Sequence, residues 1–263
     1  MGSISIASLT KRFETGDSSV TALDDITLTV EEKQIVTLVG ASGCGKSTLL
    51  NLIAGFETPT HGRVLVDGRP VKGPGPDRGV VFQQTALFPW LSVEDNIAFG
   101  LSLRANRGKG SREQVVERML QRTGLSAFRQ RKPAELSGGM RQRAAIASVL
   151  AITPSTLLMD EPFGALDSLT RSIMQDFLLE IWEEQRKTVV LVTHDIDEAI
   201  YLADRTVVMT AHPGRICEII DVDLPWPRRY EMRSDAAFIR LRDHVTEIVR
   251  TEAIQGAVAS AIN

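Results

Sequence analysis

A glycine-rich stretch near residue 40 has the residue types and spacing of a loop that binds phosphate. Residues 40–47 read Gly-Ala-Ser-Gly-Cys-Gly-Lys-Ser, which fits the P-loop pattern G-x-x-x-x-G-K-[ST]. In such a loop the backbone N–H groups point toward phosphate oxygens, and the start of the following helix adds the positive end of its dipole. The pattern predicts that Lys46 reaches the β- and γ-phosphates of a nucleotide and that Ser47 binds Mg²⁺.

The sequence on both sides of this loop supports the same interpretation. An apolar segment over 34–39 has the composition of a buried strand, and the apolar residues of 49–56 recur with the spacing of one helix face. Gly55 stands near the position where that helix needs a C-terminal cap. A glycine-rich turn that binds nothing is the alternative, and the strand before the loop and the helix after it argue against that alternative.

Two carboxylates follow each other at the end of a second apolar segment. Residues 156–160 are predicted to form a buried strand, which ends with Asp160 and is followed by Glu161. Ligands of open α/β sheets bind at the carboxyl ends of strands. Asp160 therefore suits the Mg²⁺ shell, and Glu161 suits polarising the water that attacks the γ-phosphate. An acidic pair that only starts a helix is the alternative, because the helix dipole favours acids there.

A third anion-binding pattern lies between these two motifs. Ser137 is followed by Gly138 and Gly139, and a predicted helix with Arg141 and Arg143 comes next. A hydroxyl and backbone N–H groups at a helix start can bind an anion. An ordinary helix N-cap with a flexible turn is the alternative. If this loop and the P-loop serve the same γ-phosphate, they must come from different subunits or different modules.

The elements that must position these residues alternate between strands and helices. Strands are predicted over 28–30, 34–39, 63–67, 79–83, 156–160 and 188–194. A mainly helical segment is predicted from about 85 to 150, and further helices are predicted around 169–181, 196–203 and 238–249. This alternation predicts an α/β fold with a mainly parallel sheet.

Three finer expectations concern single elements. Ser111 and Gln114 are spaced as a capping box at the start of a helix. Four apolar residues define the predicted core face of another helix, namely Leu169, Ile173, Phe177 and Ile181. Residues 224–230 are expected to be extended, because each proline disfavours helix in the residue before it.

The overall composition is that of an ordinary packed protein. The chain has 263 residues, 43% of them hydrophobic and 24% charged, which excludes collagenous, disordered and coiled-coil classes. Its 30 basic and 33 acidic side chains give a formal charge of -3, so no basic field favours nucleic acid. Two cysteines are too few for a disulfide framework, and no stretch is long and apolar enough to cross a bilayer. Residues 1–10 lack the basic region followed by an apolar region that is expected of an export signal. A reducing cytoplasm fits these features.

The motifs, taken in order, resemble the ATP-binding subunit of an ABC transporter over about residues 4 to 220. The resemblance implies a P-loop NTPase fold with a mainly parallel core sheet, an N-terminal antiparallel β part and a helical insert subdomain. It implies an ABC ATPase domain over 1–220, with the helical subdomain inserted at about 85–150, and a C-terminal extension over 221–263 that carries one helix.

The same resemblance implies a role for each site residue. The Walker A loop would hold ATP through Gly40, Ala41, Ser42, Gly43, Cys44, Gly45, Lys46, Ser47 and Thr48. Further nucleotide contacts would come from an aromatic stack of Phe13 on adenine, from the signature residues Ser137, Gly138 and Gly139, and from the D-loop residue Asp167. Mg²⁺ would be bound by Ser47, by the Q-loop residue Gln83 and by the Walker B residue Asp160. Catalysis would fall to Glu161 as base, to His194 as sensor of the γ-phosphate and to Gln83.

Several short segments of the sequence are similar to one branch of the family, the importers of nitrate, sulfonates and taurine. The similarity rests on Gly55-Phe56, Gly73–Pro76, Phe88–Trp90, Asp95–Gly100 and Asp160–Asp167. Two residues depart from the common family pattern. Met140 replaces a glutamine of the signature, and Ser148 replaces an arginine in the helix that follows it.

These features together predict an ATP-hydrolysing subunit of an importer for a small anionic solute. The resemblance implies a head-to-tail homodimer on MgATP, separate transmembrane permease subunits, an indirect solute-binding protein and a peripheral place on the cytoplasmic face of the membrane. The permease is expected to dock near residues 83–90. A soluble ABC ATPase that acts on DNA or ribosomes is the alternative, disfavoured by the acidic balance. A P-loop kinase or GTPase would need another site in place of residues 136–140.

Overall fold

The computed structural model describes residues 2–16, 18–103, 111–211 and 213–262. Contacts within the chain divide it into two compact units. Residues 1–75 and 186–263 form unit 1, and residues 76–185 form unit 2.

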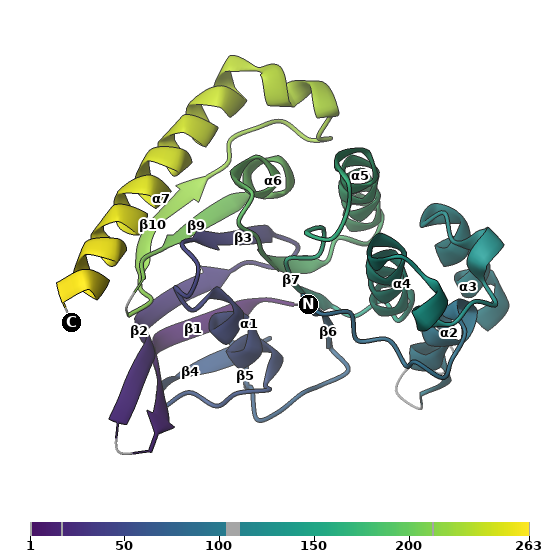
Figure 1. The fold of residues 1–263 in the computed structure, drawn as a ribbon, viewed down its shortest axis with the longest axis horizontal. Coiled ribbons are helices and arrows are strands. Elements are labelled where there is room, and N and C mark those ends of the chain that lie inside the picture. Colours follow the sequence, from purple (N-terminus) through teal and green to yellow (C-terminus); the bar gives the residue numbers. More distant parts are fainter. Residues whose placement is uncertain (1, 17, 104–110, 212, 263) are drawn as a thin grey trace. The chain divides into compact units, whose positions relative to one another are not determined.

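Unit 1 contains two sheets and the helices that cover them (Figure 1). Its strands are β1 (Ile4–Thr15), β2 (Ser18–Val30), β3 (Ile35–Gly40), β4 (His61–Val66), β5 (Arg69–Pro70), β8 (Thr188–Val192), β9 (Arg205–Met209) and β10 (Ile216–Asp221). Its helices are α1 (Lys46–Ala54), α6 (Ile196–Leu202), the short 3-10 helix η4 (Tyr230–Ser234) and α7 (Ala236–Ile262).

The first sheet of unit 1 is antiparallel and has the strand order β2-β1-β4-β5. Its long hairpin of β1 and β2 confirms the antiparallel part that the family resemblance implies. The alternation pattern alone predicted only 28–30 of this hairpin. Much of β2 near the turn is exposed and polar, so its residues lack the apolar run by which a strand is recognised.

The second sheet of unit 1 has β3 at its centre, between β8 and β9. β3 pairs with both neighbours in parallel, and β10 joins β9 in antiparallel register. All residues of β3 and β8 are buried, as expected for parallel strands covered on both faces. Helix α1 packs near β3 and β8, while α6 and α7 also contact β3. The P-loop thus follows a fully buried strand that is paired on both sides.

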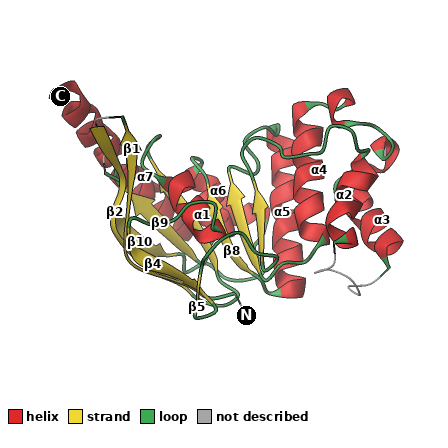
Figure 2. Ribbon diagram, turned by 90° about the horizontal axis from the view of Figure 1, so that it is seen from below, coloured by secondary structure: helices red, strands yellow, loops and turns green. Residues whose placement is uncertain are grey.

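Unit 2 combines a parallel strand pair with a group of helices (Figure 2). The pair is β6 (Arg78–Val81) and β7 (Thr156–Asp160). The helices are α2 (Val93–Ser102), α3 (Arg112–Arg122), the 3-10 turns η2 (Ser126–Phe128) and η3 (Pro133–Glu135), α4 (Gly138–Ala151) and α5 (Ser168–Gln185). Helix α2 packs against α3 and α4, so the helices between residues 93 and 151 form one packed group.

Two of the finer expectations about helices are wrong. Ser111 precedes α3 but makes no side-chain cap bond within the described residues, and its hydroxyl donates to the Glu113 carboxylate instead. On α5 the predicted core face is buried only in its second half. Leu169 is 71% exposed and Ile173 is 54% exposed, whereas Phe177 is buried. A periodic apolar face shows which residues share a side of a helix, but not where the covering layer ends.

Other expectations about single elements hold. Gly55 ends α1 with a φ of 84°. At the start of α2, the Ser92 hydroxyl accepts from the Asp95 N–H at 3.1 Å. Residues 224–229 lie outside helices and strands, whereas Tyr230, the last residue of the segment predicted to be extended, already begins η4. In the part of the chain that the structure describes, every helix is too short or too polar to cross a bilayer.

Candidate functional site

The phosphate-binding loop connects the buried strand β3 to helix α1 within unit 1. Its glycines adopt positive φ values, 151° at Gly40, 79° at Gly43 and 90° at Gly45. A Cβ at Gly45 would lie 2.5 Å from a methyl carbon of Leu23, and one at Gly40 would lie 2.5 Å from the carbonyl oxygen of Met209. Both positions therefore require glycine for space as well as for backbone conformation.

The lysine of this loop is held by the loop itself. The side chain of Lys46 is buried, and its ammonium donates to the carbonyl oxygens of Gly40 and Ala41, each at 2.9 Å. It also lies 3.4 Å from the Cys44 sulfur. Carbonyl oxygens satisfy the ammonium but do not neutralise its charge. The loop therefore keeps a positive charge in a largely enclosed position, which favours an anion.

The first turn of α1 adds backbone donors to this charge. Gly45 occupies the N-cap position and has no side chain that could accept from the first N–H groups. Those groups are thus donors for a phosphate oxygen. Ser47 is exposed in the same turn, whereas Cys44 is fully buried. Cys44 therefore fills space inside the loop.

Two more predicted residues belong to unit 1. His194 is exposed and lies between the end of β8 and the start of α6, where Asp195 caps the helix by accepting from the Glu198 N–H at 3.0 Å. Phe13 lies on β1 with 37% of its surface exposed, and the Lys11 ammonium lies 4.6 Å from its ring centroid. An exposed ring of this kind can accept a stacked base.

In unit 2 the structure brings the predicted base and the Q-loop glutamine together. Glu161 follows β7 and Gln83 follows β6, the parallel neighbour of β7. The Gln83 amide nitrogen donates to the Glu161 carboxylate at 3.0 Å. Glu161 has a φ of 44°, a backbone conformation that costs free energy in a residue other than glycine. The turn thus holds this carboxylate at the end of the strand pair.

The oxygen ligands predicted for Mg²⁺ fit that ion by their chemistry. Asp160 ends β7 as a partly exposed carboxylate, and the Gln83 amide keeps Oε1 as a ligand atom because its nitrogen faces Glu161. The described residues hold no group of three or more His, Cys, Asp or Glu that could form a closed metal site. Mg²⁺ needs no such group, since it usually binds one or two protein oxygens together with phosphates and water.

The signature loop and the D-loop are neighbours within unit 2. Ser137 caps α4 by accepting from the Met140 N–H at 3.2 Å. A Cβ at Gly139 would lie 3.3 Å from a methyl carbon of Leu166, which shows how closely the two loops approach. Asp167 in turn accepts from the Thr170 N–H at 3.0 Å at the start of α5. Bonds from backbone N–H groups lower the pKa of this exposed carboxyl group.

The two departures from the family pattern have simple structural consequences. Met140 contributes its backbone N–H to the cap of α4, a contact that does not depend on its side chain. Ser148 donates its hydroxyl to the carbonyl oxygen of Ala144 at 2.8 Å. The serine is thus satisfied within its own helix.

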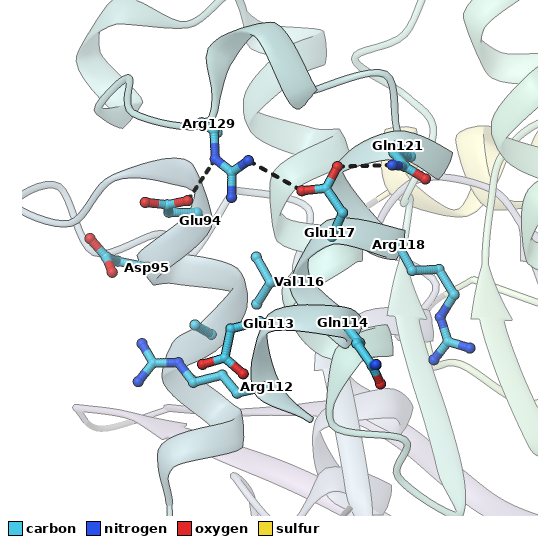
Figure 3. Close-up of a pocket in the computed structure, with 11 residues that line it drawn as sticks. Glu94, Asp95, Arg112, Glu113, Gln114, Val116, Glu117, Arg118, Gln121 and Arg129 are labelled. Carbon is cyan, nitrogen blue, oxygen red and sulfur yellow. Dashed lines mark hydrogen bonds and ion pairs between the residues drawn. The ribbon is translucent and has the colours of Figure 1, made fainter. Parts of the chain in front are cut away.

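Unit 2 also contains a cavity of about 690 Å³ that the sequence did not reveal (Figure 3). It lies between α2 and α3, and Val116 and Ala98 contribute apolar surface to it. Arg129 donates to the carboxylates of Glu94, at 2.8 Å, and Glu117, at 3.2 Å. Charged residues on a helix usually indicate a solvated face, so no sequence signal distinguished these from ordinary surface residues.

The predicted site residues therefore fall into two groups. Unit 1 contains the loop 40–48, Phe13 and His194, and unit 2 contains Gln83, Asp160, Glu161, Ser137, Gly138, Gly139 and Asp167. Within unit 2 the structure pairs Gln83 with Glu161 and places the signature loop beside the D-loop. The action of both groups on one nucleotide remains a prediction.

Comparison with known proteins identifies the family. Residues 23–164 match the model of the ABC transporter family. The chain is 45% identical to the nitrate import ATP-binding protein of Synechococcus elongatus, over 91% of this chain and 88% of that one. It is also 45% identical to the aliphatic sulfonates import ATP-binding protein of Bacillus licheniformis, over 95% of each chain.

A solved structure gives the same answer for the fold. It is described as the dimeric structure of a post-hydrolysis state of an ATP-binding cassette bound to ADP and Pi, and it covers 84% of this chain and 100% of its own. The TM-score is 0.76 at 33% sequence identity. The α/β fold with an antiparallel β part and a helical group is thereby confirmed. The chain belongs to the ABC transporter family, as an ATP-binding subunit that hydrolyses ATP.

Proposed function

We propose that this chain powers an importer for a small anionic solute such as a sulfonate, taurine or nitrate. The observation that carries the enzymatic part is the hydrogen bond between Gln83 and Glu161 at the ends of the paired strands β6 and β7. The solute class is supported by the relatives, which are named as nitrate and sulfonate import proteins. The solute itself would touch other subunits of the transporter.

The residues of unit 1 would bind the nucleotide. The backbone donors of the loop 40–48 and the Lys46 ammonium would hold the phosphates, and the exposed Phe13 ring would stack on adenine. Lys46 would exchange its bonds with the Gly40 and Ala41 carbonyl oxygens for bonds to phosphate. His194 would contact the γ-phosphate.

The residues of unit 2 would carry out hydrolysis on the same nucleotide. Glu161 would accept a proton from the attacking water while the water oxygen bonds to the γ-phosphorus and the bond to ADP breaks. The amide of Gln83 would orient that carboxylate through the bond seen in the structure. Bound Mg²⁺, held by Ser47, Gln83 and Asp160, would neutralise charge on the phosphates.

Two copies of the chain would form each pair of active sites, head to tail. Ser137, with Gly138 and Gly139, would contact the γ-phosphate bound to the other copy, and Asp167 would lie at the same interface. The dimeric form of the solved cassette supports this arrangement. A phosphate held from two sides explains why one chain carries two loops suited to anions.

Separate permease subunits would dock on an aromatic surface of unit 2. Phe82 and Trp90 are 37% and 67% exposed. The Phe88 ring lies 5.5 Å from that of Trp90 and 4.4 Å from that of Phe99. Exposed aromatic clusters of this kind are typical of protein interfaces. The permease would receive solute from a solute-binding protein and keep this chain at the cytoplasmic face of the membrane.

The variant Glu161→Gln tests the enzymatic assignment. Loss of the base should lower turnover roughly 10²- to 10⁴-fold while ATP binding persists. MgATP should then trap a dimer, seen by gel filtration. Hydrolysis near the wild-type rate would contradict the role of Glu161. A variant that stays monomeric with MgATP would contradict the dimer model.

Membrane association tests the importer assignment. Co-expression with its permease should bring the chain to the membrane fraction, and the variant Trp90→Ala should weaken this association. Phe128→Ala is the matched control, since Phe128 is an exposed aromatic residue of the same unit at 38% exposure. Sedimentation with ribosomes or a shift of a DNA probe would instead favour a soluble ABC ATPase.

A further inference from the structure

A cluster in unit 1 joins the C-terminal segment to both elements that lead to nucleotide-binding residues. Its centre is the pair Ala203–Asp204, which follows helix α6 and precedes β9. Arg228 contacts the first residue of the pair and Trp226 contacts the second. The sequence did not single out any of these residues.

Arg228 caps the C-terminal end of α6. Arg228 is buried, with 7% of its surface exposed, and its Nη2 donates to the carbonyl oxygen of Ala203. The guanidinium also stacks on the Trp226 ring, with 4.3 Å between its carbon and the ring centroid. Burial lowers the pKa of Arg228 and the Asp204 carboxylate opposes that shift. The negative end of the helix dipole lies at this C-terminal end of α6 and stabilises a cation there.

Asp204 connects the same point to the start of β3. Its Oδ2 accepts from the Ile35 N–H at 2.8 Å, and its own N–H donates to the Ile35 carbonyl oxygen at 2.8 Å. Its Oδ1 accepts from the indole N–H of Trp226 at 3.0 Å. The C-terminal segment is thus bonded to the end of α6 directly and to the start of β3 through one carboxylate.

The opposite ends of these two elements hold predicted site residues. β3 ends at Gly40, where the P-loop begins, and α6 starts two residues after His194. The Thr193 N–H donates to the Leu38 carbonyl oxygen at 3.2 Å. Because α6 has only seven residues and is therefore about 10 Å long, a shift at its C-terminal end moves its N-terminal end as well.

We propose that Arg228 is a positioning residue that acts through α6 on His194. By fixing the C-terminal end of this short helix, Arg228 keeps His194 at the right distance from the phosphates held by the P-loop. The inference rests on the proposed role of His194 as the contact of the γ-phosphate. It also gives the C-terminal extension a part in ATP hydrolysis.

A double-mutant cycle tests this inference. Arg228→Met keeps most of the apolar volume but removes the cation and the bond to Ala203. We expect it to lower kcat roughly tenfold, with the dissociation constant for ATP changed less than about twofold. In the His194→Ala background the same substitution should change kcat less than about twofold, because the residue through which it acts is gone.

Arg205→Met is the matched control. Arg205 also lies in unit 1 and donates to a backbone carbonyl oxygen, that of Thr29 at 3.2 Å, but it holds no end of α6. We expect kcat to stay within about twofold of the wild type. The NMR signals of the His194 ring, assigned with His194→Ala, should shift in Arg228→Met and stay in place in Arg205→Met.

Two outcomes would overturn the inference. These are an unchanged kcat in Arg228→Met, or an equal loss in both His194 backgrounds. A His194→Ala variant with wild-type kcat would instead refute the proposed role of His194. If Arg228→Met does not fold, Arg228→Gln decides in its place, since it removes the cation at the end of α6 and keeps a polar side chain near the Ala203 carbonyl oxygen. A decrease in kcat that the substitution causes in the wild type but not in the His194→Ala background supports the inference, and any other result overturns it.

Discussion

The P-loop and the signature loop both place glycines at the start of a helix, but they are satisfied in opposite ways. At α1 the N-cap is Gly45, which has no side-chain acceptor, and the first turn contains the buried ammonium of Lys46. At α4 the N-cap is Ser137, whose hydroxyl already accepts from the Met140 N–H. The first loop thus has donors left over, and the second has part of its donors used.

The basic side chains near the two loops also have different roles. Among the described residues, the Lys46 ammonium bonds neutral groups of its own loop, the carbonyl oxygens of Gly40 and Ala41 and the Cys44 thiol. Near the signature loop, Arg141 donates to the Leu136 carbonyl oxygen and Arg143 to that of Thr123, both at 2.7 Å. These arginines hold the fold of unit 2. We therefore expect the P-loop to bind a nucleotide by itself and the signature loop to bind only a nucleotide that another chain already holds.

The largest expected effect separates the two loops by nucleotide affinity. Lys46→Ala removes the charge of the P-loop and should weaken ATP binding by the monomer roughly 100-fold. Ser137→Arg should leave monomer affinity within about threefold, because the signature loop takes no part in that step, yet it should abolish dimer formation. Binding of a fluorescent ATP analogue to dilute protein measures the first quantity. Equal losses in the two variants would contradict the comparison.

A mixture of these two inactive variants tests whether each site is built from two chains. In a heterodimer, one site combines both defects and the other joins an intact P-loop to an intact signature loop. Activity should return to about a quarter of the wild-type rate if subunits pair at random and one site turns over alone.

The mixture should also be assayed for dimers that form only with ATP, since coupling between the sites can suppress turnover. A mixture that shows neither activity nor dimers counts against the head-to-tail arrangement.

A smaller effect separates the two serine caps of unit 2. Ser137→Ala and Ser92→Ala each remove an acceptor for a helix N–H, bonded at 3.2 Å and 3.1 Å, and each should cost about 1 kcal/mol of stability. Only Ser137→Ala should also lower the ATPase rate, roughly tenfold. Urea unfolding and steady-state ATPase assays give the two quantities. A loss of rate in Ser92→Ala that matches the loss in Ser137→Ala would reduce the serine of the signature to a helix cap.

Local sequence patterns predicted single loops and strands of the fold and the candidate site, but not which strands pair. The P-loop and the strand before Asp160 follow directly from local patterns, since strand β7 has the bounds that the alternation predicts. The bond between Gln83 and Glu161 joins residues 78 positions apart. Only the pairing of β6 with β7 brings them together, and single-sequence patterns do not specify which strands pair.

Two parts of unit 1 escaped the local patterns for different reasons. The hairpin of β1 and β2 is exposed and polar near its turn, whereas the joint at Ala203–Asp204 relies on partners far away in the chain, Ile35 and Trp226 for Asp204. An acidic residue after a helix is ordinary in a sequence, and its value as a hydrogen-bond centre appears only when the distant donors are in place. For the same reason the exposure of Leu169 on α5 could not be inferred from its periodic spacing.

The smallest expected effect concerns the side chain at signature position 140. In the signature loop, we expect the Ser137 hydroxyl and backbone N–H groups to contact the phosphate, and Met140 contributes its backbone N–H to the cap. Met140→Gln restores the residue commonest in the family, and we expect the ATPase rate to stay within about twofold of the wild type. The matched change in the other loop is Cys44→Ala, which removes a buried sulfur near the Lys46 ammonium. It should lower stability by about 1 kcal/mol without changing ATP affinity more than about twofold. A tenfold change of the ATPase rate in Met140→Gln would show that the signature loop recognises phosphate through this side chain. Phosphate recognition in that loop could then no longer be assigned to the Ser137 hydroxyl and the backbone N–H groups alone.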